Sequence, residues 1–116
     1  MKRNKAAVKH AKDLIKAGKY NEDSDWSEDQ PSSDDENKFL DQHGWEEYGQ
    51  WFLAIDTDEN EETKGHYNFP YGDFKKVHRD GVIAAKQRAA QYDHAEIEKA
   101  ADELLKLIDE DMKEKA

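Results

Sequence analysis

The sequence predicts a small α+β domain that is mostly α-helical, with about four to five helices and one short β-hairpin. Apolar residues recur at helical spacing in most segments, whereas one stretch in the middle of the chain alternates aromatic and other residues. The length indicates one folded unit, because 116 residues suffice to bury one hydrophobic core. We therefore expect residues 1–116 to form a single domain.

The first predicted helix covers residues 5–17. Its apolar positions recur every three or four residues, and they are Ala7, Ala11, Leu14 and Ile15. Gly18 follows directly and is a candidate for the C-cap. The pattern is typical of an amphipathic helix that buries one face.

A strongly acidic stretch comes next. Residues 21–36 hold eight acidic residues and no basic residue, together with the Ser, Asn and Pro content of a loop. We expect a flexible, protease-sensitive loop at about residues 21–36, with Trp26 anchoring one end. A short helix is expected to begin at Ser32 or Ser33, because three acids follow, and to end at Gly44.

The middle of the chain is aromatic: nine of its twelve aromatic residues lie between Phe39 and Phe74. A compact helix is predicted from residue 45 to residue 55, with its apolar stripe at Trp45, Tyr48, Phe52 and Ile55. We expect Trp51 and Phe52 to be core residues, since burial of such a ring stabilises by about 1.5–3 kcal/mol.

The alternating stretch predicts the hairpin. Residues 67–71 alternate three aromatic residues with Asn68 and Pro70, and a Gly-Asp turn follows at residues 72–73. Residues 74–77 are expected to form the second strand. Because Pro70 cannot donate a hydrogen bond, at least one strand should lie at an edge.

Two helices are predicted to end the chain. Asp80 is placed to cap the first of them, whose shared face carries Val82, Ala85, Ala89 and Tyr92. Asp93 and Glu96 have the spacing of a capping box for the second. The inner face of that last helix is formed by Ile97, Ala100, Ala101, Leu104, Leu105 and Ile108.

Composition excludes several functions. The chain has no cysteine, which rules out disulfides, thiolate ligands and cysteine nucleophiles. No run of about 18 apolar residues occurs, so we expect no membrane insertion. The charged N-terminal segment does not resemble a secretory signal, so we expect a cytoplasmic protein. A net charge of −10 disfavours non-specific nucleic-acid contact, although residues 1–19 hold seven basic residues and one acidic residue.

The histidines form no catalytic or metal-binding signature. Five are present, but no His-x-x-x-His pair is among them. Facing hairpin strands can bring His66 and His78 together, with Asp73 or Asp80 beside them, but the spacing fixes no third ligand. We therefore predict no catalytic residue, no metal and no cofactor.

The basic and aromatic segment at residues 67–88 is the predicted working surface. Its candidate binding residues are Tyr71, Lys75, Lys76, His78, Arg79, Lys86 and Arg88. Cations mixed with aromatic rings are typical of single-strand nucleic-acid binders. However, Lys86 and Arg88 point to different sides of their helix, so these charges cannot all share one footprint.

These segments resemble a small uncharacterised domain of phage and prophage proteins, which stands alone or is joined to capsid-maturation proteases. The resemblance runs through nearly the whole chain, in residues 10–19, 26–27, 51–56, 62–72, 76–79, 87–91 and 100–109. It implies an accessory module and not a hydrolase, because nothing here corresponds to a protease nucleophile. The acidic stretch is longer and more charged than the pattern of that domain.

The sequence thus predicts a non-catalytic protein-interaction or accessory module, phage-associated, with an unidentified protein partner. The alternative is a nucleic-acid-binding module that uses residues 67–88. No pattern in the chain defines an oligomeric state.

Overall fold

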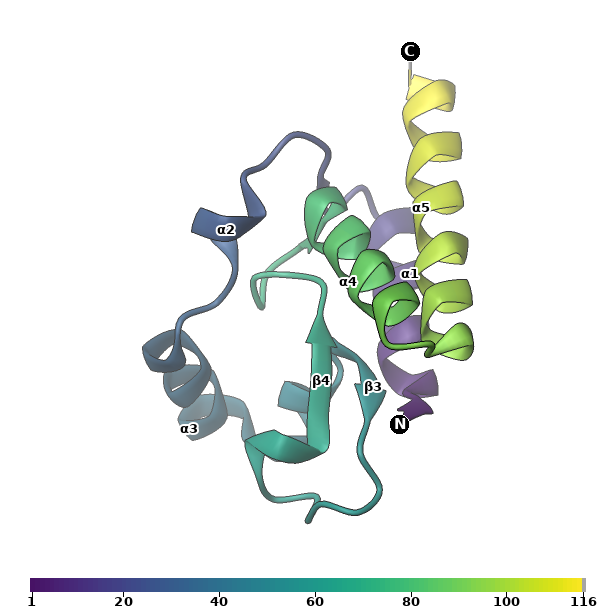
Figure 1. The fold of residues 1–116 in the computed structure, drawn as a ribbon. Coiled ribbons are helices and arrows are strands. Elements are labelled where there is room, and N and C mark those ends of the chain that lie inside the picture. Colours follow the sequence, from purple (N-terminus) through teal and green to yellow (C-terminus); the bar gives the residue numbers. More distant parts are fainter. Residues whose placement is uncertain (116) are drawn as a thin grey trace.

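The first helix of the chain and its last two helices form one side of the molecule. In the computed structural model, which describes residues 1–115, α1 (Lys5–Lys16) and α4 (Arg79–Gln91) both pack against α5 (Ala95–Lys115) (Figure 1). Small side chains in these contacts let the helices approach closely, and the buried alanines are Ala7, Ala11, Ala85, Ala89, Ala100 and Ala101. The mostly α-helical α+β class is confirmed, and so are these three helices.

The helix ends differ in detail from the predicted ones. Gly18 follows α1 with φ +77°, the left-handed backbone that glycine adopts most readily. Asp93 also has a positive φ, 59°, and lies between α4 and α5. It therefore ends one helix and does not cap the next, so the predicted capping box is wrong. Asp80 lies within the first turn of α4, one position after the helix begins.

A three-stranded antiparallel sheet lies beside this helical layer. Its order is β1 (Lys2–Arg3), β3 (Phe52–Ile55) and β4 (Tyr67–Pro70), with β3 in the centre. The register pairs Lys2 with Ile55 and Phe52 with Pro70. Because β4 is an edge strand, the missing N–H of Pro70 is tolerated there.

The helix predicted for residues 45–55 is wrong beyond Gly49, where α3 (Ser33–Gly49) ends. Phe52, Leu53 and Ala54 are consecutive and all buried, as expected of a central strand covered on both faces. The apolar residues of segment 45–55 fit a helix as well as a strand, because a short apolar run does not distinguish the two by periodicity. The core assignment is confirmed, since Trp51 is 5% exposed and Phe52 is 3% exposed.

The hairpin joins different strands from those predicted. β4 pairs with β3 through residues 56–66, which include a 3-10 turn, η1 (Lys64–His66). β5 (Val77–His78) instead pairs in parallel with β2 (Tyr20–Asn21), more than fifty residues earlier. A parallel partner that distant leaves no local turn signal, so the sequence did not reveal it.

The acidic stretch contains more secondary structure than a loop. A single helical turn, α2 (Trp26–Asp29), is capped by Asp25, and α3 starts with a capping box formed by Ser32 and Asp35. The predicted start of that helix is confirmed, and its first part does end at Gly44, where φ is +83°. Whether residues 21–36 are mobile stays a prediction.

No helix in the described part of the chain is long and apolar enough to cross a membrane.

Candidate interaction surface

A short loop displays the two lysines that the sequence singled out. We call residues 73–76 the tip loop; it is closed by a bridge between Gly72 and Val77. The Asp73 carboxylate accepts hydrogen bonds from the backbone N–H groups of Lys75, at 3.0 Å, and Lys76, at 2.9 Å. Both lysine side chains are exposed. The loop therefore has a fixed backbone and a displayed pair of cations.

The buried side chain of His78 contacts the tip loop. It is 3% exposed, and its Nε2 atom lies 2.9 Å from Asp73 Oδ2. Its Nδ1 atom lies 2.9 Å from Ser24 Oγ, on the segment that leads into α2. One buried imidazole thus links the tip loop to the acidic stretch. The predicted placement of His78 on a binding surface is wrong, because the ring is in the interior.

Ser24, His78 and Asp73 have the residue types of a catalytic triad, but their surroundings favour a structural role. The Trp26 ring lies 5.6 Å from the imidazole ring and covers it. Neither Ser24 nor His78 lines any of five hollows on the described surface, although Asp73 lines one of them. A nucleophile must be accessible to its substrate, so the burial of His78 favours the structural role.

Burial alone would raise the pKa of Asp73, but hydrogen bonds from His78 and from the N–H groups of Lys76 and Lys75 outweigh it and lower that pKa. A lowered pKa stabilises the fold above the ordinary value of 3.8, and this stability is lost as the pH falls through the folded-state pKa. We therefore expect Asp73→Asn to lower the urea midpoint at neutral pH and to lower it much less near about pH 2. An equal loss at both pH values would contradict this account.

Tyr71 is also buried and is not a surface residue. Its exposed fraction is 0%, and its hydroxyl donates a 2.7 Å hydrogen bond to the Gln50 carbonyl oxygen. Its ring stacks on Trp51 at 5.6 Å. The alternation of residues 67–71 correctly predicted a strand, β4, but it did not reveal that other residues cover the Tyr71 side chain. Its predicted role in binding is therefore wrong.

The remaining predicted cations are mostly engaged within the protein. Arg79 pairs with Asp109 at 3.1 Å, and Lys86 pairs with Asp102 at 2.6 Å. Both acids lie on α5, which packs beside α4. Arg88 lies 5.9 Å from the centre of the ring of Tyr92, the residue that directly follows α4. These three charges therefore form no shared basic surface with the tip loop.

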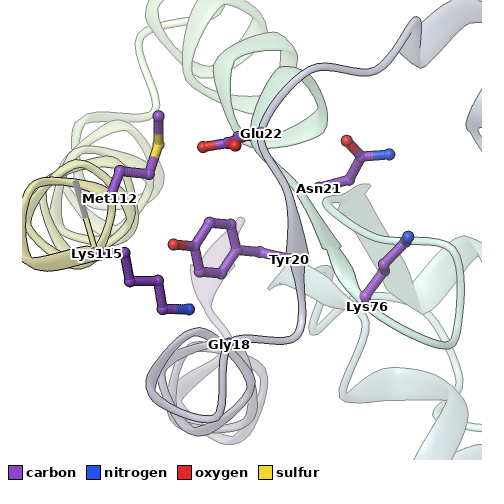
Figure 2. A pocket seen from close by; sticks show the side chains of 7 residues that line it. All are labelled: Gly18, Tyr20, Asn21, Glu22, Lys76, Met112 and Lys115. Atoms are coloured by element: carbon purple, nitrogen blue, oxygen red, sulfur yellow. The ribbon is translucent and has the colours of Figure 1, made fainter.

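The two exposed lysines border two different hollows. Lys76 borders a hollow of about 630 Å³ around Tyr20, between β2 and the end of α5 (Figure 2). Lys75 borders a second one, of about 640 Å³, between the tip loop and α3, which we call the aromatic hollow. The lining residues of the aromatic hollow are Asp35, Lys38, Phe39, Gln42, His43, Asp73, Phe74 and Lys75.

Two polar side chains of the Tyr20 hollow, Tyr20 and Lys115, already have partners within the protein. The Tyr20 hydroxyl donates to Asp111 Oδ2, and this hydrogen bond raises the pKa of Tyr20 to about 12. Lys115 lies 3.0 Å from the same carboxylate and 5.3 Å from the centre of the Tyr20 ring. Figure 2 shows the Tyr20 ring directed toward Met112 and Lys115. This arrangement stabilises the contact between β2 and α5, and it leaves few polar groups to bind a ligand.

The aromatic hollow contains an unusual stack of rings. Phe39 lies between His43, at 4.3 Å, and Phe74, at 4.5 Å, with interplanar angles of 28° and 15°. Phe39 and Phe74 are half-buried, and His43 is exposed. Lys38 and Lys75 are exposed beside the stack. The sequence analysis missed this pairing because the two phenylalanines are 35 positions apart, on elements with no predicted contact.

His66 and His78 are held by separate partners. The Nδ1 atom of His66 lies 2.7 Å from the Asp56 carbonyl oxygen and 3.0 Å from that of Glu59, whereas His78 contacts Ser24. Among residues 1–115, no group of three or more His, Asp or Glu side chains is arranged to hold a metal ion. The idea that these two histidines share a metal gains no support from this arrangement.

Comparisons with models of known families, with curated proteins and with solved structures give no match to this chain. The resemblance to the phage domain therefore stays a prediction.

Proposed function

We propose that this protein is a non-catalytic module that binds another protein through the aromatic hollow. The partner segment would place an apolar side chain against Phe39 and Phe74 and carboxylates near Lys38 and Lys75. The observation that supports this most is the half-buried ring stack in a hollow that is also lined by Lys38 and Lys75, together with Asp35 and Asp73. An apolar centre with a charged rim is the usual composition of a protein interface.

The backbone of Phe74 gives independent support. Its φ is +66°, in the left-handed region that a bulky residue rarely adopts. Such a conformation costs about 1–3 kcal/mol and is found mostly where function requires it. The Phe74 ring packs against Tyr48, Trp51 and Phe52 of the core and stacks on Phe39. This backbone conformation therefore holds the ring between the core and the aromatic hollow.

The accessory role in a phage and a cytoplasmic location are part of the same proposal. Nucleic-acid binding by residues 67–88 is the weaker alternative, because Tyr71 is buried and the charges of Arg79 and Lys86 are paired.

Adjacent lysines provide a matched test. Lys75→Glu should prevent partner binding, because it reverses a charge on the rim of the aromatic hollow. Lys76→Glu makes the same change in net charge one position away but faces the Tyr20 hollow, so it should keep binding. Affinity capture from the source cells with both variants, quantified by mass spectrometry against the wild-type protein, measures the difference.

Folding and specificity are controlled separately. Both variants should melt within a degree or two of the wild-type protein, since exposed charges contribute about 0–1 kcal/mol. A protein captured by the wild type and by Lys76→Glu, but lost with Lys75→Glu and with Lys38→Glu, is the expected result. Equal capture by all four proteins would refute binding at the aromatic hollow.

A further inference from the structure

A second surface, at the other end of the chain, concentrates positive charge. A hollow of about 660 Å³ lies where β1 meets the start of α1, and we call it the basic hollow. Its lining residues are Lys2, Arg3, Lys5, Val8, Lys9, Lys12 and Glu96. Five cations and one carboxylate therefore line a single hollow in a protein whose net charge is −10.

The ion pairs around this hollow leave an excess of positive charge. Arg3 and Lys12 both approach the Glu103 carboxylate, and Lys9 lies 3.3 Å from Asp13. Within the described residues, no carboxylate comes within ion-pair distance of Lys2 or Lys5, and both side chains are exposed. Exposed pairs such as Lys9 with Asp13 are weak and can exchange partners.

The lysines also form a row. Positions 5, 9 and 12 are four and three residues apart, so these side chains share one face of α1. Position 16 continues the same face, and its lysine is exposed. A row of point charges along about 16 Å of helix suits an extended anion with repeated charges better than a single small one.

The first turn of α1 contains no acidic residue, although acids are favoured there and cations disfavoured by the helix dipole. Lys5, the first residue of α1, is therefore at a slightly unfavourable position, and an anion bound beside it would interact favourably with both the lysine and the helix dipole.

We infer that the basic hollow binds the phosphodiester backbone of a nucleic acid, independently of base sequence. Val8 is its one apolar lining residue, so the hollow lacks the apolar centre that a protein partner would bury. It also lacks an aromatic lining residue on which a base could stack. What remains is phosphate neutralisation by lysine, which supplies affinity without reading sequence. This surface is separate from the aromatic hollow and does not depend on its proposed role.

The test compares two triple variants that change the net charge equally. Lys2→Gln, Lys5→Gln and Lys9→Gln remove three cations from the basic hollow, whereas Lys99→Gln, Lys106→Gln and Lys113→Gln remove three exposed lysines from α5. Binding to a fluorescent duplex DNA of mixed sequence is followed by anisotropy between about 50 and 200 mM salt. The first triple variant should bind more weakly, with a slope of log affinity against log salt that is shallower by about 2.7. The α5 triple variant should match the wild type.

Two controls make each outcome decisive. Thermal melting should show the first triple variant to be close to the wild type in stability, because all three lysines are exposed and the one ion pair lost, Lys9 with Asp13, is a surface pair worth about 0–1 kcal/mol. Polyglutamate of similar charge is added as a competitor. Absence of wild-type binding at the lowest salt, equal losses in both triple variants, or displacement of the DNA by equimolar polyglutamate would each overturn the inference. The last result would assign the hollow to an acidic protein segment.

Discussion

Phe52→Ala is expected to lower the free energy of unfolding by about 3–5 kcal/mol, the range for deleting a buried aromatic ring. Phe52 lies on the central strand with 3% of its surface exposed, and its ring is 4.7 Å from that of Tyr48. Deletion removes the burial energy of the ring and leaves a cavity that rigid neighbours cannot fill. Because small domains are stable by only about 5–15 kcal/mol, the variant should be close to unfolding at room temperature.

Urea unfolding followed by tryptophan fluorescence measures this loss. Tyr92→Ala is the control, because Tyr92 is 57% exposed and its truncation should change stability by no more than about 0.5 kcal/mol. A Phe52→Ala midpoint equal to that of the wild type would show that Phe52 is not a core residue.

Gly72→Ala should produce the second large effect, a loss of about 3 kcal/mol at the upper end of the range for overpacking. A Cβ atom at position 72 would lie 2.6 Å from the Lys76 carbonyl oxygen and 2.7 Å from the Trp51 ring. Neither can move away easily, since the first is loop backbone and the second is a buried ring. The tip loop should therefore open, and its lysines should lose their fixed position.

Amide hydrogen exchange at Lys75 and Lys76 reports this opening, because Asp73 protects both N–H groups. Exchange at these two positions should become faster in Gly72→Ala. Gly65→Ala is the matched control, since its Cβ would meet Glu59 only at an ordinary 3.6 Å. If Gly72→Ala kept both the wild-type stability and the slow exchange, the close packing beneath the tip loop would be refuted.

Local signals in the sequence were sufficient for α1, α4 and α5 and for the start of α3, but not for α2 or the end of α3. The periodicity of α1 and α5 and the serine before α3 all act within a few residues, so they can be read without knowledge of the fold. The strands were less accessible. β1 and β2 are two residues long, and their partners lie about fifty positions away, at Ile55 and Val77. Only the folded chain brings such short segments together.

In the candidate site, too, local features were predicted from the sequence, whereas the contacts made by the folded chain were not. Lys75 and Lys76 were predicted as exposed residues from the Gly-Asp turn, and the structure confirms their exposure. Tyr71 and His78 were predicted beside them but are buried, because alternation gives the face of a residue and not what covers that face. Phe39 carried a signal that could have been used, since it is a large apolar residue in a helix start that is otherwise mostly polar.

Crosslinking inside the cell tests the central claim most directly, because it reports contact with a partner at one chosen position. A photoreactive phenylalanine analogue is placed at Gln42, which lines the aromatic hollow, and separately at Gln87, which is exposed on α4. We predict a discrete protein adduct from position 42 that is absent from position 87 and is lost when Lys75→Glu is added. No adduct from position 42, or the same adduct with equal yield from position 87, would contradict the proposal that the aromatic hollow is the docking surface.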